Sequence, residues 1–561
     1  MAQMSYDMGL QEGTMRLTRT GVAAVVAVLS AAGVIAATTT SGASAATARP
    51  ADDHHSVIIP GDLLVSESYY LNDPGIVAGT TILPPGAGSA GTAAIAGGNY
   101  PYVFNNDKVD GSFGVVSPLV LSELTTSGRP VARIPVPSQY INTSFSSKSE
   151  GALNLSTDGN YVTFIDYAAA PDTVDASNGN TPGVIDPTNP VPGAYYREVA
   201  SLDADGHFTF TATNAYSGNN GRAAIAASVG GQEYYYTAGN AGNGANPQPN
   251  GVILGAGAQI ITPSTQNLYD QVPGTPTPVG AFNVTELGDK ADKIGKDTNF
   301  RGLTISNNVL YYTKGSGGNG VNTVYFLDTT GKACPNGTGL PQPGATLPTT
   351  GLPVDLATLQ SGGLPTNMCV LKGFPTALAK NATDASDYPF GLWFANANTL
   401  YVADEGAGDN AFANGSYTAA AASTTAGLQK WVFDASAGQW NLAYTLQSGL
   451  NLGTPYTVDG YPTGTNSVTG LPWTPATGGL RNIVGKVNRD GTVTLWGVTS
   501  TVSGSGDQGA DPNQLVSITD NLSATSLPSG ESFQTVIAPS YDKVVRGVSF
   551  TPGTGSGNGH H

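Results

Sequence analysis

Charge is scarce in this chain of 561 residues, and positive charge is scarcer than negative. Asp, Glu, Lys and Arg together make up 11% of the sequence, well below the roughly 25% of an ordinary globular domain. The 40 acidic residues outnumber the 23 Lys and Arg residues, which gives a formal net charge of −17. Because such a chain is repelled by phosphate backbones, we expect no nucleic-acid partner.

Long apolar runs are also rare, and the only prominent one lies near the N-terminus. Met15–Arg19 is a basic segment, residues 21–37 form an apolar stretch rich in small and β-branched residues, and Ala43-Ser44-Ala45 provides an A-x-A cleavage site. This order is typical of a secretory signal peptide cut after Ala45. Met15 would then be the natural start, and residues 1–14 would precede it. A membrane anchor is the alternative, but the apolar run is short and no later stretch could span a bilayer. We therefore expect a secreted, extracellular monomer without a stable membrane span; the periplasm and the cell surface are the alternatives.

Histidine and cysteine are few, which narrows the chemistry further. Four of the five histidines lie in terminal segments, and His207 lies on a predicted outer strand. A histidine-based metal site or a histidine general base is therefore not expected. The two cysteines, Cys334 and Cys369, flank a segment rich in Gly, Pro and Thr, and in an exported protein we expect them to form one disulfide. A catalytic thiol is the alternative.

One pattern recurs six times along the rest of the chain. A landmark residue precedes a small residue, an alternating apolar strand, a tight turn and a second, aromatic-rich strand. The landmarks are Glu150, Arg222, Arg301, Phe390, Arg481 and Arg546. Turns such as Asn307-Asn308 and Asp490-Gly491 contain the residues that two-residue hairpins need, because both central positions take positive φ. Where these pairs continue into third and fourth strands, the unit has the make-up of a β-propeller blade.

The two ends of the chain complement each other. The last unit has a first strand at 546–550 without a partner, whereas 61–67 resembles a second strand without a first. Joining them, with 114–124 and 131–136 as outer strands, completes a sixth blade and leaves no free sheet edge.

The predicted fold is therefore an all-β, six-bladed β-propeller, closed by N- and C-terminal strands that share one blade. It would occupy residues 61–552, after a linker at 46–60 and before a flexible tail at 553–561. Seven blades is the alternative if one long loop contains a further blade.

One blade resembles known propeller families. Gly391-Leu-Trp-Phe is followed by Asn398-Thr-Leu-Tyr-Val-Ala-Asp404-Glu405, which is similar to the DGNTLYVAD-type strands of NHL-like and YVTN-like propellers. The resemblance implies a fold and no particular chemistry, since these superfamilies include lactonases, lyases, hydrolases, scaffolds and ligand-binding domains.

Arginine is concentrated at the landmark position. Nine arginines follow the signal peptide, and four of them, Arg222, Arg301, Arg481 and Arg546, are landmarks. The innermost strands of a propeller all start at one face of the central channel, so we expect these guanidinium groups to converge there. Arginine suits carboxylate and phosphate, because its planar fork donates two parallel hydrogen bonds. The pattern predicts an anion-binding site at the channel mouth.

A second repeat position, the end of the second strand, also carries charged residues. They are Glu67, Asp166, Lys314 and Asp404. The loop after this strand opens on the same face as the landmarks, so acids and arginines could instead form a ring of salt bridges between blades. The two interpretations are compatible, and Glu67 and Lys314 are further candidates for ligand binding.

The carboxylates beside the arginines suggest a class of chemistry. Glu150, Asp166, Asp404 or Glu405 could act as general acid or base, with pKa values set by burial and neighbouring charges. Paired carboxylates with an arginine cluster suit cleavage of an acidic sugar. We expect binding of an anionic small molecule or acidic polysaccharide at the axial channel, with hydrolysis or elimination as the candidate chemistry; the sequence does not decide whether the protein is an enzyme. The alternatives are a non-enzymatic adhesion or scaffold propeller and a calcium-dependent, lactonase-like hydrolase.

The sequence requires no cofactor, and calcium is the metal that it best accommodates. Asp404 and Glu405 with Asp409, or Asp507 with Asp511, could supply the oxygen ligands that calcium prefers. Acidic loops are also commonly just solvated, so the metal site stays undetermined at this point.

Overall fold

The structure, a computed structural model, describes most of the chain beyond residue 57. The described residues are 58–71, 75–77, 79–83, 94–95, 97–105, 114–147, 149–183, 189, 191–240, 257–264, 299–316, 321–334, 337–349, 368–377, 379 and 387–555. The predicted signal peptide, most of the predicted linker and the end of the predicted tail lie outside them. Within them the main strands form six sheets, arranged as the blades of a six-bladed β-propeller, so the predicted fold class is confirmed.

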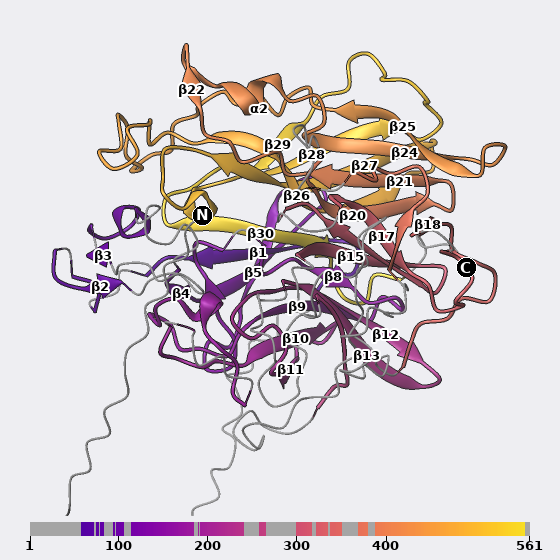
Figure 1. Cartoon of the computed structure of the whole chain (residues 1–561), viewed down its shortest axis with the longest axis horizontal. Coiled ribbons are helices and arrows are strands. Elements are labelled where there is room, and N and C mark those ends of the chain that lie inside the picture. Colours follow the sequence, from indigo (N-terminus) through magenta and orange to yellow (C-terminus); the bar gives the residue numbers. More distant parts are fainter. Residues whose placement is uncertain are drawn as a thin grey trace, which may run out of the picture. The chain divides into compact units, whose positions relative to one another are not determined.

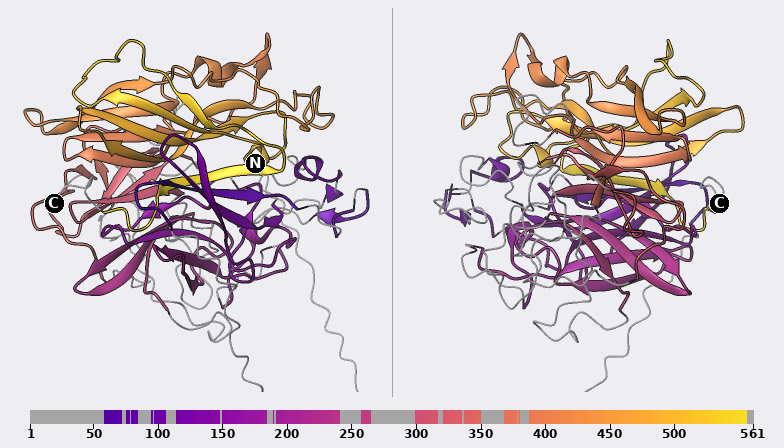
Figure 2. Two further views of the ribbon diagram at one scale, coloured as in Figure 1. Left: turned by 180° about the vertical axis from the view of Figure 1, so that it is seen from behind. Right: turned by 45° about the vertical axis from the view of Figure 1, so that its right-hand side comes forward.

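Blade 1 combines strands that are far apart in the sequence. From the axis outward it contains β30 (Lys543–Phe550), β1 (Leu63–Tyr69), β5 (Leu119–Leu124) and β6 (Pro130–Pro135). β1 runs antiparallel to β30, with Leu63 opposite Phe550 and Tyr69 opposite Lys543. The yellow β30 lies beside the indigo β1 in Figure 1, and the views in Figure 2 agree. The predicted pairing of the N-terminal strand with the C-terminal strand is thus present.

Blades 2, 3 and 4 follow in chain order. Blade 2 contains β8 (Asn154–Leu155), β9 (Tyr161–Tyr167), β10 (Arg197–Asp203) and β11 (Phe208–Thr213). Blade 3 contains β12 (Gly221–Val229), β13 (Gln232–Gly239) and β14 (Ala258–Ile261). Blade 4 contains β15 (Phe300–Ser306), β16 (Val309–Lys314), β17 (Thr323–Leu327), β19 (Met368–Leu371) and β18 (Thr338–Gly339). The predicted disulfide is confirmed in blade 4, where Cys334 and Cys369 are joined with their Cα atoms 5.7 Å apart.

Blades 5 and 6 have four strands each. Blade 5 contains β20 (Pro389–Asn396), β21 (Thr399–Asp404), β24 (Gly427–Asp434) and β25 (Gln439–Leu446). Blade 6 contains β26 (Ala476–Val487), β27 (Thr492–Val502), β28 (Leu515–Asn521) and β29 (Gln534–Ile537).

The loops contain short strand pairs and short helical turns. The strand pairs are β2 (Ile82–Leu83) with β3 (Ala94–Ile95), β4 (Val116–Ser117) with β7 (Thr143–Ser144), and β22 (Phe412–Ala413) with β23 (Ser416–Tyr417). The helical turns are η1 (Tyr102–Phe104), η2 (Ala176–Asn178), α2 (Thr418–Ala422) and η6 (Gln508–Ala510). Among the described residues, no helix has the length and apolar character needed to cross a membrane.

The innermost strands form a ring around the axis. β30 contacts β8, and the contacts continue from β8 to β12, β15, β20 and β26 and back to β30. Hydrogen bonds also join neighbouring blades here: Ser66 Oγ on β1 donates to the carbonyl oxygen of Gly151, before β8, at 2.5 Å, and Asn482 Oδ1 on β26 accepts from the backbone N–H of Val548 on β30 at 2.6 Å. These bonds fix the position of each blade along the axis relative to its neighbour, and this sets the positions of the landmark residues.

The landmark residues lie at β-bulges. In blades 1, 3, 4, 5 and 6 the register between the innermost and second strands shifts at the landmark. Arg222, for example, lies between Gly221, which pairs with Gly239, and Ala223, which pairs with Ala238. A bulged residue has no partner opposite it and its side chain is re-aimed. The recurring landmark is therefore the sequence signature of a bulge on each of these innermost strands.

The small residue after the landmark has a packing reason. A Cβ atom on Gly391 would lie 2.5 Å from the carbonyl oxygen of Arg481, and one on Gly547 would lie 2.5 Å from that of Gly151. Glycine at this position lets neighbouring innermost strands approach closely.

Candidate functional site

The four landmark arginines lie on innermost strands and are close enough for their charges to influence one another. They are buried, with exposed fractions between 5% and 8%. Burial, followed by the charge of Arg301, lowers the pKa of Arg222 from its usual 12.5 to about 9. Burial also lowers the pKa of Arg481 and Arg546, and each of these arginines is influenced by another landmark arginine. We call this region the arginine end; it comprises Arg222, Arg301, Arg481 and Arg546 together with Glu150 and Glu405.

Glu405 is the carboxylate that bridges two of these arginines. Its Oε1 lies 3.5 Å from Arg301 Nη2, and its Oε2 lies 3.3 Å from Arg481 Nε. The residue follows β21 of blade 5, while the arginines belong to blades 4 and 6. Glu405 therefore forms salt bridges between blades, which is one of the two interpretations that the sequence allowed.

Arg222 is bound differently. Its Nη1 donates to the side-chain oxygen of Asn299 and, at 3.1 Å, to the carbonyl oxygen of Phe300. Its Nε has no hydrogen-bond partner, and the Nε of Arg301 has none either. No carboxylate of the described residues lies within ion-pair distance of Arg222.

Arg546 is held by backbone carbonyls. Its Nε donates to Ser68 Oγ at 2.8 Å, and its two Nη atoms donate to the carbonyl oxygens of Ser147 at 2.5 Å, Ser144 at 2.9 Å and Phe145. Within the described part of the chain it too forms no ion pair. These bonds tie blade 1 to the segment that leads into blade 2.

Glu150 belongs to a buried polar cluster. Its Oε1 accepts hydrogen bonds from the hydroxyl of Tyr167 and, at 2.7 Å, from Nδ2 of Asn220, while its Oε2 has no hydrogen-bond partner. Burial raises the pKa of Tyr167 well above its usual value, so the phenol remains a donor. The guanidinium of Arg197 lies over the Tyr167 ring, 4.9 Å from its centroid.

Arg197 was not a candidate from the sequence. It is fully buried and donates to the carbonyl oxygens of Tyr195, Gly179 and Asn219 at 2.6–3.0 Å. It starts β10, an outer strand, so it does not share the landmark repeat. The alternation of apolar and polar residues along one strand does not reveal that an arginine on it is fully buried.

Asp166 and Asp404 are enclosed acids. Burial raises the pKa of Asp166 well above its usual value, with the charge of Glu150 as the second cause. Burial also raises the pKa of Asp404 to about 7, although its oxygens accept hydrogen bonds from the backbone N–H groups of Tyr388 at 2.7 Å and Gly406 at 2.9 Å. Neither acid lies within ion-pair distance of a described arginine. Asp404 therefore anchors the loop that presents Glu405.

Glu67 and Lys314 occupy the position equivalent to Asp404. Glu67 lies opposite Val545, Lys314 opposite Phe300 and Asp404 opposite Pro389, and each of these opposing residues immediately precedes a landmark. Glu67 binds Lys543 Nζ at 2.8 Å and also accepts from Tyr69 and Ser122. Lys314 donates to the carbonyl oxygen of Ser316 at 2.7 Å and to Asn322 at 3.2 Å. These bonds give each buried charge partners in its own blade.

The calcium candidates do not form a cluster with metal-ligand spacing in the described residues. Asp507 accepts from the backbone N–H of Gly509 at 3.3 Å, and Asp511 accepts from the hydroxyl of Tyr461 at 2.8 Å. The described group that does have such spacing is Asp203, Asp205 and His207, in the exposed turn between β10 and β11. There Asp203 already accepts from the backbone N–H groups of Asp205 and His207, which is the bonding of an ordinary turn.

Comparisons with known proteins do not identify a family. No family model and no curated protein matches the chain. Among solved structures, a polysaccharide lyase of family PL25, an ulvan lyase bound to -[GlcA(1-4)Rha3S]-, is 11% identical, with 84% of this chain and 96% of that chain covered and a TM-score of 0.28. A mutant of Synechocystis apocarotenoid oxygenase is 9% identical (88% and 97% covered, TM-score 0.28), and extracellular domains 1–2 of Drosophila Semaphorin 1a are 10% identical (83% and 88% covered, TM-score 0.26). Such distant likenesses carry no argument about function, and the resemblance to NHL-like and YVTN-like propellers is not confirmed.

Proposed function

We propose that this chain is an exported β-propeller that binds an anionic ligand, either a carboxylate-bearing small molecule or an acidic polysaccharide, at the arginine end. The observation that carries the proposal is the excess of guanidinium groups over carboxylates there. Of the acids nearby, Glu405 alone forms ion pairs with described landmark arginines, and it serves Arg301 and Arg481. Arg222 is left without a carboxylate partner in the described residues.

The electrostatics favour an added negative charge. Like charges repel strongly where burial excludes water, and a carboxylate between them would relieve that repulsion. The Nε atoms of Arg222 and Arg301 are buried donors without hydrogen-bond partners, which is costly unless an acceptor is supplied. We infer that a ligand carboxylate accepts from both, and charge-assisted bonds of this kind are among the strongest in proteins.

One observation supports a structural role at one position. Arg546 donates four hydrogen bonds to Ser68 and to the carbonyls of the segment around Ser144, so its guanidinium is already satisfied. The proposal therefore assigns anion binding to Arg222, Arg301 and Arg481, with Arg546 as the residue that holds the neighbouring loop.

A thermal-shift screen tests the proposal. Mature protein would be heated with uronates, sialate, phosphate, lactones and calcium, in parallel with Arg222→Ala, Arg222→Lys and the exposed control Arg489→Ala. A ligand that binds the folded state alone at 100 times its Kd adds about 2.7 kcal/mol of stability. We expect uronate or sialate to raise Tm in the wild type and in Arg489→Ala, weakly in Arg222→Lys, and not in Arg222→Ala.

Two outcomes would count against it. If no anion shifts the wild type, or if Arg222→Ala responds as the wild type does, the arginines act as blade-to-blade links and the scaffold alternative is preferred. A shift with calcium alone that a chelator reverses would favour the lactonase-like alternative.

A further inference from the structure

A cavity lies further along the innermost strands, beyond the landmark residues. It has a volume of about 550 Å³, and its lining includes the residue three positions after the landmark in every blade. These six residues are Leu153, Ile225, Thr304, Trp393, Val484 and Ser549. Each of these residues follows its landmark by three positions, so the chain leads from the arginine end to this cavity in every blade. We call the cavity the axial pocket.

The axial pocket carries no charge. None of the described residues that line it is Asp, Glu, Lys, Arg or His, although the whole chain contains 23 Lys and Arg and 40 Asp and Glu residues. An anion would find no countercharge there, in contrast to the arginine end. The lining therefore selects for an uncharged ligand.

Polar groups at the rim are available for hydrogen bonds. The side chains of Thr304, Ser306, Asn307 and Asn308 line the pocket, and none has a side-chain hydrogen bond to another described residue. Asn154 uses its Nδ2 to donate to the carbonyl oxygen of Ala224 at 3.0 Å, which leaves its Oδ1 as an acceptor. The rim thus offers both donors and acceptors, which a purely apolar ligand would leave unused.

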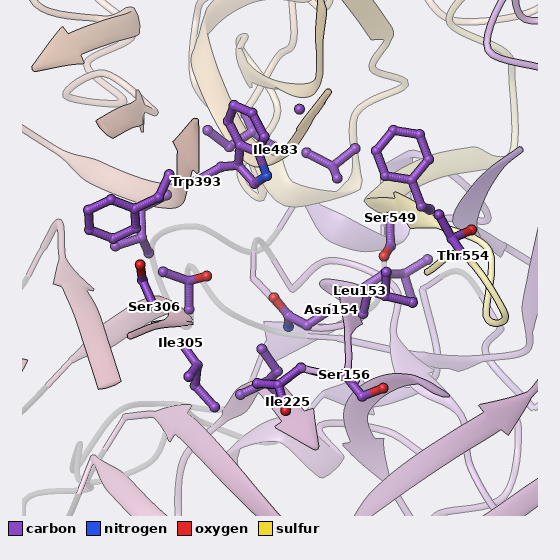
Figure 3. Close-up of a pocket in the computed structure, with 18 of the residues that line it drawn as sticks. Leu153, Asn154, Ser156, Ile225, Ile305, Ser306, Trp393, Ile483, Ser549 and Thr554 are labelled. Carbon is purple, nitrogen blue, oxygen red and sulfur yellow. The ribbon is translucent and has the colours of Figure 1, made fainter. Parts of the chain in front are cut away.

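Trp393 provides an apolar surface in this polar setting. Its side chain is half-buried and lines the pocket. A Cβ atom on Gly485 would lie 2.6 Å from the indole ring, so the glycine lets the ring pack against the backbone of blade 6 and fixes its orientation. Figure 3 shows Trp393 on one side of the open space, with Asn154 and Ser156 on the other.

We propose that the axial pocket binds an uncharged saccharide. The apolar C–H face of a sugar ring stacks on an aromatic side chain, while its hydroxyls exchange hydrogen bonds with amide and hydroxyl groups. Trp393 is the stacking platform, and Thr304, Ser306 and Asn308 are the hydrogen-bonding residues. The volume falls within the range of roughly 300–1,000 Å³ that is usual for small-molecule sites. This site is separate from the arginine end and does not depend on the function proposed for it.

Calorimetric titration with neutral tetrasaccharides built from glucose, xylose, mannose or galactose tests the proposal. We expect at least one of them to bind the wild type, with a Kd raised tenfold or more in Trp393→Ala and less in Trp393→Phe. Thr304→Val keeps the side-chain shape and should raise Kd several-fold by removing one hydroxyl. Tyr102→Ala, which removes an exposed aromatic ring outside the pocket, and Arg489→Ala, which removes an exposed charge, should leave Kd unchanged.

The contradicting results are distinct from those for the arginine end. Absence of binding by all of the neutral sugars at millimolar concentration, or equal Kd values for wild type, Trp393→Ala and Thr304→Val, would overturn the proposal. So would binding of an apolar dye that the sugars fail to displace and that Trp393→Ala abolishes, because the pocket would then be an apolar site. Thr304→Val serves as the second readout if Trp393→Ala proves poorly folded by circular dichroism.

Discussion

Buried cations in this chain are satisfied in more than one way. Arg197 and Arg546 donate chiefly to backbone carbonyls, whereas Arg301 and Arg481 share Glu405. Lys430 forms a fully buried ion pair with Asp520 at 2.9 Å. Bonds to carbonyls fix loops in place without neutralising the charge, so the arginine end keeps its positive potential while remaining ordered.

The role of Arg546 as a loop anchor predicts a loss of stability. Arg546→Met removes donors from the carbonyls of Ser144 and Phe145, which are buried residues, and from that of the half-buried Ser147. We expect the free energy of unfolding in urea to fall by about 2–4 kcal/mol, because buried acceptors without partners are costly. The exposed control Arg489→Ala should change it by less than about 0.5 kcal/mol. Equal stability of Arg546→Met and wild type would show that the anchor is dispensable.

Asp404 predicts a pH dependence of stability. Burial raises its pKa from 3.8 to about 7 in the folded state, so between these pH values the folded protein binds a proton that the unfolded chain has released. Its contribution to stability is therefore largest at low pH and falls as pH rises, by about 2 kcal/mol between pH 5 and pH 7.

Urea denaturation of wild type and Asp404→Asn at pH 5 and pH 7 measures this contribution. The wild type should lose stability relative to the variant as the pH rises. A difference between the two proteins that stays constant with pH would mean that Asp404 does not titrate in this range.

The sequence predicted part of the candidate site. It identified the four arginines because they share one repeat position, and the structure explains that position as a bulge. It proposed Asp404 and Glu405 together, but Glu405 forms the ion pairs while Asp404 binds backbone N–H groups. The sequence did not predict the axial pocket, because the residues three positions after the landmarks differ in type, from Leu153 to Trp393. They line the same cavity but show no common side-chain chemistry that a repeat search would detect.

At the scale of the strand, the glycine after the landmark should be indispensable. Gly391→Ala would place a Cβ atom 2.5 Å from the carbonyl oxygen of Arg481, and a backbone atom cannot move aside cheaply. We expect a loss of about 2 kcal/mol or more in the free energy of unfolding. The matched control is Gly555→Ala, where a Cβ atom would meet nothing within 4 Å. Similar melting temperatures for Gly391→Ala and the control would contradict the close-approach explanation.

Most hairpins were predictable from their turns. Asn307 and Asn308 have φ values of 50° and 58°, as the turn between β15 and β16 requires. The apolar strand predicted after the landmark Glu150 is shorter than expected, because Gly151 has a φ of 74° and extended pairing begins only at Asn154. The parallel pairing of β18 with β19 was not predicted, since it joins a two-residue strand to a strand far along the chain.

For the molecule as a whole, the pairing of β30 with β1 predicts that the last strand is essential for folding. A chain that stops at Asp542 lacks the innermost strand of blade 1, which contacts the innermost strands of blades 2 and 6. We expect calorimetry to show no cooperative thermal unfolding for this shorter chain, whereas a chain that stops at Gly555 should still unfold cooperatively. Cooperative melting of the shorter chain near the wild-type Tm would show that the ring is stable without β30.

A crystal structure with a bound uronate oligosaccharide would test whether the arginine end holds an anion between Arg222 and Arg301. We expect density for a carboxylate within hydrogen-bond distance of the Nε atoms of both arginines, and no such density in crystals of Arg222→Ala grown the same way. Clear density for the sugar elsewhere on the protein, or an unoccupied arginine end at saturating ligand, would contradict it.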